Sequence, residues 1–363
     1  MTLRLIQVGV GGWGESWLDK TMRSPACEVV AIVGRGTAAL DAAQARHGIE
    51  ANRCFTSLKD AASEHEADAA LICIPSAEHL LIATEAFEAG LHVLLEKPIA
   101  DTMEDARELV RRGEDAGRVL MIAQNYRYRP AARTVAKLLS DGWLGAVESV
   151  TIEYRKAPHF IRPDVVHGYS GFRMIEDMTV HHLDQMRGVL HEEPAYVYGR
   201  ARHPAWSWFS DPSILTAVIE MESGALVEYF ASWVSRGRQT SWDGSWLIDC
   251  ENGQVEWADN RVRVRPEEVY YTVELEGFAD RGGWMEAQGW MEAGFADVRT
   301  AGRDYILEAF AHSISTSTEP ETSGRDNLRS LAPAFALADS VRTGEARRVA
   351  DYLGVKESVP AAL

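Results

Sequence analysis

Cysteine is scarce in this sequence of 363 residues, and long apolar runs are missing. Its four cysteines are scattered and form no C-x-x-C pair: Cys27, Cys54, Cys73 and Cys250. That spacing fits neither a zinc site nor a disulfide framework and is typical of a reducing compartment. No run of eighteen apolar residues occurs, so no transmembrane helix is predicted. No signal-peptide pattern is present at the first apolar run, and we therefore expect a cytoplasmic protein.

The sequence also has fewer basic residues than acidic ones. Lys and Arg number 37 against 54 Asp and Glu, which gives a net charge of −17. Such a surface repels phosphate backbones, and the densest basic stretch, Arg347-Arg348, is too short to offset it. We therefore expect no nucleic-acid partner. An apolar content of 46% and a charged content of 25% indicate an ordinary globular protein, and the length favours two domains.

The first 125 residues alternate between short apolar runs and helical segments. The runs are rich in β-branched residues, as strands covered on both faces are; they lie at 3–8, 29–33, 68–74, 92–95 and 119–123. Strands that alternate with helices of this length predict βαβ units and a doubly wound parallel sheet. After Pro130 strand-like segments follow one another with few helices, which predicts a second, largely antiparallel α/β domain. We place the boundary near residue 125.

A glycine-rich loop follows the first predicted strand and opens the first predicted helix. Gly9-Val10-Gly11-Gly12-Trp13-Gly14 fits the pattern G-x-G-x-x-G. The glycines of this pattern allow a tight turn, close approach of the backbone to a pyrophosphate, and close packing of helix on strand. The helix N-terminus offers its free N–H groups to the phosphates. The loop predicts a dinucleotide site.

The end of the second strand bears on the choice of dinucleotide. NAD sites normally carry an acidic residue there, which accepts from the ribose hydroxyls. This chain has Gly34 followed by Arg35. Absence of the acid removes repulsion of a 2′-phosphate, and Arg35 offers it a bidentate partner, so NADP is favoured. The alternative is that Arg35 only stacks on the adenine, which serves NAD equally well.

Two groups of polar residues are candidates for chemistry. Glu96-Lys97-Pro98 ends a buried strand, at the edge where open α/β sheets bind ligands, and a lysine there can stabilise a developing alkoxide. Asp177, His181 and Asp184 have the i, i+4, i+7 spacing of one helix face, where a carboxylate can orient a proton-accepting imidazole. Taken separately, each group could also consist of ordinary polar residues on the protein surface. Metal binding is a competing interpretation of the second, but no HExxH motif or cysteine partner supports it.

Together these residues resemble the family of glucose–fructose oxidoreductase, inositol dehydrogenase and MocA-like proteins. The matching segments follow one another over nearly the whole chain: the glycine loop, Cys73-Ile74-Pro75-Ser76 with His79, Glu96-Lys97-Pro98, the D-x-x-x-H-x-x-D pattern from Asp177 to Asp184, and Thr322-Ser323-Gly324-Arg325-Asp326. The resemblance implies a Rossmann domain at 1–125. It further implies an α/β domain at 126–363 with an open, mostly antiparallel sheet that binds substrate and forms the oligomer contact.

The resemblance also implies roles for individual residues. Catalysis would rest on Lys97, Asp177 and His181. The cofactor would be bound by residues of the loops that follow the strands: Gly9, Gly11, Gly12, Trp13, Gly14, Arg35, Ile74, Pro75, His79, Glu96, Lys97 and Gln124. The substrate would meet Lys97, Asp177 and His181 together with Asn125, Tyr126, Arg127, Arg173 and His182. Arg173 stands where the family often has a glycine, and His182 is an extra ring beside His181, so substrate identity does not transfer.

The sequence thus predicts an NAD(P)-dependent oxidoreductase that acts, without a metal, on a secondary hydroxyl of a sugar, cyclitol or related polyol. We expect a homo-oligomer that contacts neither nucleic acid nor membrane. Two alternatives stay open. The same oxidation could occur transiently during cleavage of a glycosidic bond, or the fold could serve a non-catalytic sugar-sensing protein, which would not need Lys97, Asp177 and His181 together.

Overall fold

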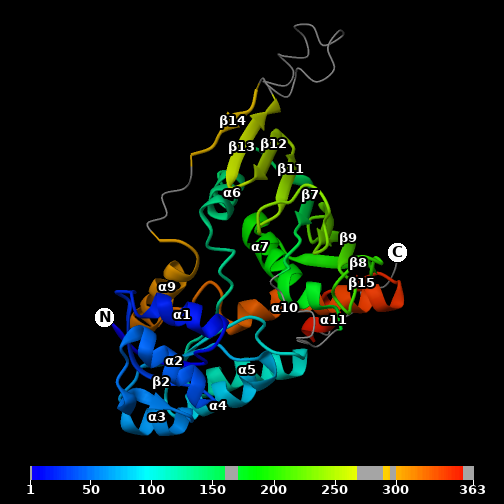
Figure 1. Ribbon diagram of the computed structural model, residues 1–363. Helices are drawn as coiled ribbons and strands as arrows, with labels where there is room; N and C mark the ends of the chain where they lie inside the picture. The colour runs from blue at the N-terminus through cyan, green and yellow to red at the C-terminus, as the bar shows by residue number, and fades with distance from the viewer. Residues whose placement is uncertain (1, 160–170, 268–288, 295–299, 355–363) are drawn as a thin grey trace, which may run out of the picture. The chain divides into compact units, whose positions relative to one another are not determined.

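The structure, a computed structural model, describes residues 2–159, 171–267, 289–294 and 300–354 (Figure 1). The chain forms two compact units, Met1–Tyr128 with Thr300–Leu331 and Arg129–Arg299 with Ala332–Leu363. The first break lies three residues from the expected boundary at 125. The segment 300–331, which the sequence analysis assigned to the second domain, belongs to the first unit.

The first unit is built on a six-stranded parallel sheet in the order β3-β2-β1-β4-β5-β6. Its strands are β1 Leu3–Val8, β2 Cys27–Val33, β3 Cys54–Phe55, β4 Ala69–Ile72, β5 His92–Leu95 and β6 Leu120–Ile122. The four residues of β4 are all buried, as expected of a strand covered on both faces. The prediction of a doubly wound parallel sheet is confirmed.

Helices cover this sheet. They are α1 Trp13–Thr21, α2 Thr37–His47, α3 Leu58–Glu64, α4 His79–Glu88, α5 Met103–Asp115 and α9 Gly302–Thr316, with 3-10 turns η1 Ala51–Arg53 and η2 Ser76–Glu78. The late helix α9 inserts Ile306, Leu307 and Phe310 into the core formed with β1 and β4. Lys20 of α1 also pairs with Asp304 of α9 at 2.6 Å. This burial explains why segment 300–331 belongs to the first unit.

The edge strand β6 is completed by the same late segment. The Ile122 N–H donates to the Thr322 carbonyl, and the Thr322 hydroxyl donates to the Ile122 carbonyl, both at 2.8 Å. Met121 and Ser323 form an isolated antiparallel bridge. A side chain at Gly324 would lie 2.5 Å from the Leu120 side chain, so the approach of the two segments requires glycine. These contacts account for the Thr-Ser-Gly sequence there.

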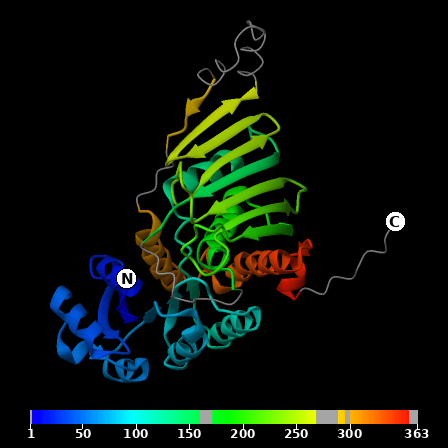
Figure 2. The same ribbon diagram turned by 45° about the vertical axis from the view of Figure 1, so that its right-hand side comes forward.

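The second unit contains a nine-stranded sheet in the order β14-β13-β12-β11-β7-β10-β9-β8-β15 (Figure 2). Its strands are β7 Val147–Arg155, β8 Pro194–Arg202, β9 Ile214–Met221, β10 Leu226–Ser232, β11 Ser245–Cys250, β12 Gly253–Ala258, β13 Arg261–Pro266, β14 Met291–Glu292 and β15 Arg347–Arg348. Seven of the neighbouring pairs are antiparallel, and β7 with β10 is parallel. The expected open, mostly antiparallel sheet is confirmed.

One face of this sheet is buried and the other is open. Along β9, buried residues alternate with exposed ones, as in a sheet packed on one side. Among its described residues, the helices of the unit are α6 Pro130–Ser140, α7 Val180–Leu190, the C-terminal part of α10 Gly324–Thr343, and α11 Ala350–Leu353. A Cβ at Gly199 of β8 would lie 2.5 Å from Leu337 of α10, so glycine permits this close packing. A buried Asp243 binds Arg129 at 2.7 Å and Gln185 of α7 at 3.0 Å, which fixes α7.

Candidate active site

The glycine loop has the geometry that its sequence predicts. Gly9 has a φ of +90°, and a Cβ there would lie 2.0 Å from the carbonyl oxygen of Cys73. A Cβ at Gly14 would lie 2.3 Å from the Gly9 carbonyl oxygen, so both positions require glycine. A Cβ at Gly12 would meet no atom within 4 Å, which leaves the loop open to a ligand. Because α1 begins at Trp13, N–H groups of its first turn have no helical partner, although that of Gly14 donates to the Gly11 carbonyl at 3.0 Å.

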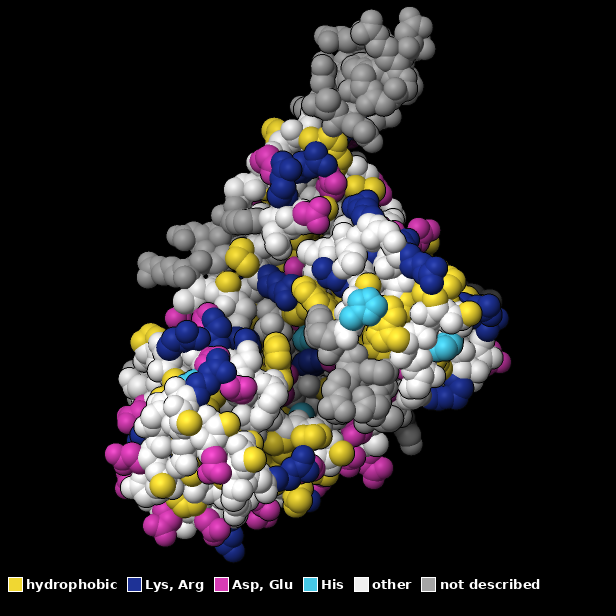
Figure 3. All heavy atoms as spheres, viewed as in Figure 1, with side chains coloured by type: hydrophobic (Ala, Val, Ile, Leu, Met, Phe, Trp, Pro, Cys, Tyr) yellow, Lys and Arg dark blue, Asp and Glu magenta, His cyan; other side chains and the backbone are white. Residues whose placement is uncertain are grey.

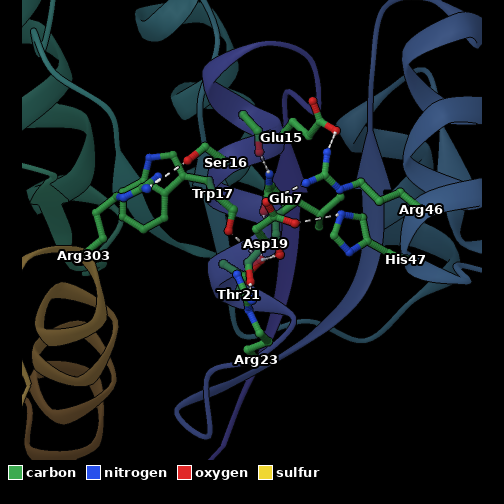
Figure 4. A network of polar contacts seen from close by, with 12 residues as sticks. Gln7, Glu15, Ser16, Trp17, Asp19, Thr21, Arg23, Arg46, His47 and Arg303 are labelled. Atoms are coloured by element: carbon green, nitrogen blue, oxygen red, sulfur yellow. Dashed lines mark hydrogen bonds and ion pairs between the residues drawn. The ribbon is translucent and has the colours of Figure 1, made fainter.

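A buried glutamine shapes this loop from below (Figure 4). The Gln7 amide of β1 donates to the carbonyls of Gly9 at 3.2 Å and Gly14 at 2.7 Å, and its oxygen accepts from the Thr21 hydroxyl at 3.0 Å. Gln7 is fully buried, so leaving these groups unpaired would cost free energy. The sequence analysis did not single out Gln7, although a polar residue within an apolar strand run was visible.

The loop lines a pocket of about 430 Å³, within the range of ligand sites. Residues at or after the ends of four parallel strands, β1, β2, β3 and β4, meet in it. Those predicted to bind cofactor are Gly9, Gly11, Arg35, Ile74 and Pro75. The open loop, the free helix N-terminus and this lining fit a dinucleotide.

At the β2 end of the pocket, Arg35 forms an ion pair. Its Nη1 donates to Glu78 Oε1 at 2.6 Å, and Glu78 comes from η2, after β4. The sequence analysis examined the end of β2 for an acid and found Gly34. A Cβ at Gly34 would lie 3.2 Å from Leu40, so this position is crowded. The carboxylate near this end of the pocket therefore comes from a different strand of the sheet.

Glu96 organises the lysine motif from within the protein. It is only 8% exposed, and its Oε1 accepts from the indole N–H groups of Trp13 at 2.7 Å and Trp17 at 2.6 Å. Its Oε2 accepts from the Lys97 backbone N–H at 2.9 Å. Both oxygens thus accept hydrogen bonds within the protein, and the contact of Glu96 with the cofactor stays a prediction. Lys97 itself is half-buried.

Arg303 lies beside Ser16 and Trp17 (Figure 4). Its guanidinium lies 4.7 Å from the Trp13 ring centroid and 5.2 Å from that of Trp17, and its Nη2 donates to the Ser16 hydroxyl at 2.9 Å. Burial lowers the pKa of Arg303. Trp13 remains 55% exposed beside the glycine loop, so it is available to a ligand.

His79 lies in the core and links two loops. Its Nδ1 is 3.0 Å from the Pro98 carbonyl oxygen, and its Nε2 is 3.0 Å from that of Ile74. Burial lowers its pKa, and the ring is 1% exposed. The direct contact of His79 with the cofactor stays a prediction. His79 joins the segment after β4 to the segment that follows Lys97.

The residues after β6 differ in their exposure. Gln124 is fully buried, Tyr126 is 8% exposed and Arg127 is 6% exposed. Arg127 pairs with Asp326 at 3.1 Å, which ties the end of β6 to the start of α10. Direct ligand contact by Gln124 and Arg127 stays a prediction. Asn125 is half-buried and stays a candidate.

The spacing of Asp177 and His181 predicted a single α-helix. The structure differs from that prediction. Residues Ile175–Thr179 form a π-helix that leads into α7. Such π turns are often found at functional sites. Asp177 is half-buried, His181 is 6% exposed and Asp184 is fully buried. Of the three, Asp177 is thus the one with appreciable exposure.

His182 is a core residue. Its Nδ1 lies 2.7 Å from the Tyr229 hydroxyl and its Nε2 3.0 Å from the Trp242 carbonyl oxygen. The ring is fully buried, which lowers its pKa to about 4. The prediction that His182 contacts substrate is therefore not supported. Arg173 is half-buried, with its backbone N–H donating to Asp211 at 2.6 Å.

No metal site accompanies these residues. Within the described ranges, no three or more His, Cys, Asp or Glu side chains are placed to hold an ion. On the face that Figure 3 presents, acidic side chains are spread over the first unit. No helix of the described residues is long and apolar enough to cross a membrane.

Two family models match the chain. An oxidoreductase family with an NAD-binding Rossmann fold matches residues 3–124, and the GFO/IDH/MocA C-terminal domain matches residues 132–256. The chain belongs to the GFO/IDH/MocA oxidoreductase family. The resemblance inferred from the motifs is thereby confirmed, and members of this family act on sugars and polyols.

Three similar proteins illustrate the family. The D-apiose dehydrogenase of Paraburkholderia graminis is 26% identical, with 98% of this chain and 91% of that protein covered. The inositol 2-dehydrogenase of Rhizobium meliloti is also 26% identical, covering 94% and 97%. An oxidoreductase from Agrobacterium radiobacter, solved with NAD+, L-tartaric acid and magnesium, has a TM-score of 0.82 at 19% identity over 97% of this chain and 99% of its own. That last likeness shows the fold alone.

Against this GFO/IDH/MocA background, the motif residues divide into two groups. Lys97, Asn125 and Asp177 keep partial exposure. The remaining members are buried, and they are His79, Glu96, Gln124, Tyr126, Arg127, His181, His182 and Asp184. Sequence reasoning missed Gln7, which bonds to the glycine loop from β1, and Glu78, which bonds to Arg35 from η2.

Proposed function

We propose that this protein is an NAD(P)-dependent oxidoreductase that oxidises a secondary hydroxyl of a sugar, cyclitol or related polyol, or reduces the corresponding ketone. The observation that carries the proposal is the glycine loop, which is closed to side chains at Gly9 and Gly14 and open at Gly12. Lys97 follows β5 in the same sheet, at the edge where such folds bind ligands. The relatives named D-apiose dehydrogenase and inositol 2-dehydrogenase support the substrate class.

Three side chains carry the proposed chemistry. A bound nicotinamide would accept or donate the hydride. The ammonium of Lys97 would donate to the reacting oxygen and stabilise its negative charge. The imidazole of His181 would take the hydroxyl proton, and Asp177 would orient it. We assign His181 rather than His182 to this role because both ring nitrogens of His182 are engaged in the core.

We infer that NADP(H) is preferred over NAD(H). The absence of an acid at Gly34 and the presence of Arg35 in the pocket support this preference. Because position 34 is crowded by Leu40, introducing an acid there would also disturb packing, and Arg35→Ala is the cleaner test. We expect this variant to lower the ratio of NADPH to NADH affinity about tenfold. A wild type that binds NADH tenfold more tightly than NADPH would contradict the preference.

The reaction is tested with a panel of sugars and polyols, free and glycosidic, offered with NAD+ and with NADP+. We expect absorbance of the reduced nicotinamide to accumulate with at least one free polyol or sugar. Cleavage of a glycoside without such accumulation would instead indicate transient oxidation during glycosidic bond cleavage. Binding of the sugar with no turnover under any condition would favour a sensing role.

We further propose that the protein is a homo-oligomer assembled through the open face of the nine-stranded sheet. Several apolar side chains on this face are exposed, among them Tyr196, Tyr198, Val218 and Leu226. Exposed apolar patches of this kind mark interaction sites. The four cysteines are free thiols, which supports a reducing, cytoplasmic location.

A further inference from the structure

Arg35 has an acidic partner in the pocket that lies outside the glycine loop and outside the end of β2. Arg35 and Glu78 both line the pocket beside Gly9 and Gly11. Arg35 Nη1 lies 2.6 Å from Glu78 Oε1, with side-chain exposures of 74% and 34%. The pair therefore stands at the pocket surface, open to a ligand.

The ion pair places one carboxylate in competition with any phosphate that Arg35 binds. A 2′-phosphate would form charge-assisted hydrogen bonds with the Arg35 guanidinium, whose Nη1 now donates to Glu78 and whose charge Glu78 already balances. It would also bring about two negative charges next to the Glu78 carboxylate. Binding of NAD(H), which has a ribose hydroxyl in place of the 2′-phosphate, does not require Arg35 to leave Glu78. Arg35 can keep this ion pair and stack its planar guanidinium on the adenine.

We propose that Glu78 is a specificity-determining residue, which restrains Arg35 and limits the preference for NADP(H) over NAD(H). This inference rests on the proposed function, since it assumes that the pocket binds these dinucleotides. Wild type is then expected to use both cofactors. Removing the Glu78 charge releases Arg35 for the 2′-phosphate and makes the protein selective for NADP(H).

The test is direct titration of the full chain with NADPH and with NADH, followed by nicotinamide fluorescence, without any substrate. The variant Glu78→Gln keeps the size and an accepting oxygen but removes the charge. We expect NADPH to bind about tenfold more tightly to it, whereas NADH affinity changes less than threefold. The gain should fall below threefold when Arg35→Ala is also present, because the cation that Glu78 competes for is then missing.

Glu85 supplies the matched control. It lines the same pocket from α4, and among the described residues it makes no ion pair with Arg35. Glu85→Gln removes the same charge and should leave the ratio of NADPH to NADH affinity within threefold of wild type. An equal shift in Glu85→Gln and Glu78→Gln would overturn the inference, because the pocket's overall charge would then set the ratio.

The outcomes also separate this inference from the proposed function. A wild type that binds neither NADH nor NADPH would remove the proposed function itself. A wild type that prefers NADH but gains NADPH affinity in Glu78→Gln would contradict only the proposed preference. Dinucleotide binding with an unchanged ratio in Glu78→Gln would overturn the role of Glu78 alone.

Discussion

At the scale of single residues, the glycine loop depends on a side chain beneath it. Gln7 joins the carbonyls of Gly9 and Gly14, so it fixes the two ends of the loop to the strand that precedes it. The pattern G-x-G-x-x-G thus predicts which loop positions must lack a Cβ, but it does not predict the side chain that holds the loop. The polar side chain that holds the loop stands two residues before it.

We predict that Gln7→Met weakens dinucleotide binding about tenfold and lowers the free energy of unfolding by about 1–3 kcal/mol, because buried carbonyls lose their partner. Both are measured by titration with NADPH and by urea denaturation. Thr21→Val is the control, since it removes the bond to Gln7 Oε1 but spares those to the loop. It should cost stability yet bind NADPH as wild type does. Equal affinity losses in both variants would contradict the role given to the loop bonds.

A second prediction concerns the charge of Lys97. If its ammonium stabilises the substrate oxygen, Lys97→Ala should lower kcat about 10²–10³-fold, as loss of one such donor does elsewhere. NADPH affinity should stay within threefold, measured by the same titration. Lys59→Ala, an exposed lysine of α3, controls for the change in net charge. Activity of Lys97→Ala within threefold of wild type would remove Lys97 from the mechanism.

At the scale of elements, the regular parts of the fold could be predicted and the irregular ones could not. The strands β1, β2, β4 and β5 are predictable from continuous apolar runs in the sequence, because these strands are buried on both faces. By contrast β3 has two residues and α3 has seven, too few for a periodic pattern to stand out. The two-residue β15 likewise exists only through its pairing with β8.

The π turn before α7 shows why local spacing fails near the candidate site. The spacing of Asp177 and His181 suits an α-helix, and nothing in the residue types requires a wider turn. Contacts from a distant strand accompany it: Tyr229 of β10 lies 3.2 Å from the Thr179 hydroxyl and 2.7 Å from His182. The same limit applies to Glu78, which reaches Arg35 from another strand. Sequence motifs do not predict pairs such as Arg35 with Glu78, whose members lie far apart along the chain.

The two adjacent histidines should therefore differ in function. We predict that His181→Asn lowers kcat/KM about 10²–10⁴-fold, the usual contribution of a general base, and flattens its low-pH limb. His182→Asn should leave kcat within about tenfold of wild type in material that is still folded, because its ring supports the core. Initial rates across pH 5–9 measure both. Loss of turnover in His182→Asn alone would reverse the assignment.

His182 should instead govern the pH dependence of stability. Burial lowers its pKa from 6.5 to about 4, so below the unfolded value the unfolded chain binds a proton that the folded chain does not. Its contribution is therefore intact above pH 6.5 and is lost as the pH falls towards 4. We expect His182 to account for about 2 kcal/mol of the loss between pH 7.5 and pH 5. The loss measured by urea denaturation should be smaller by that amount in His182→Gln, and the buried His79 accounts for part of the remainder. The exposed His203, replaced by Gln, should keep the wild-type difference.

At the scale of the whole molecule, segments far apart in the sequence complete each unit. The segment 300–331 closes the edge of the parallel sheet at β6, and β15 closes one edge of the larger sheet. What stays uncovered in the second unit is the open face of its sheet. Alternating residues of β8 and β9 expose apolar side chains there, although a sheet face in water is expected to be mainly polar.

If a second copy of the chain covers this face, a charge at its centre must disrupt the assembly. Val218 of β9 is 45% exposed and lines the same surface as Phe230 and Thr216. We predict that Val218→Lys converts an assembly with a multiple of the 40.2 kDa chain mass into a monomer, measured by light scattering after size exclusion. Leu81→Lys, which changes an exposed apolar residue of α4, should leave the assembly intact. The fold of Val218→Lys should survive, because its side chain already faces solvent within one chain. A monomeric wild type, or an unchanged mass in Val218→Lys, would mean that this face is not the contact.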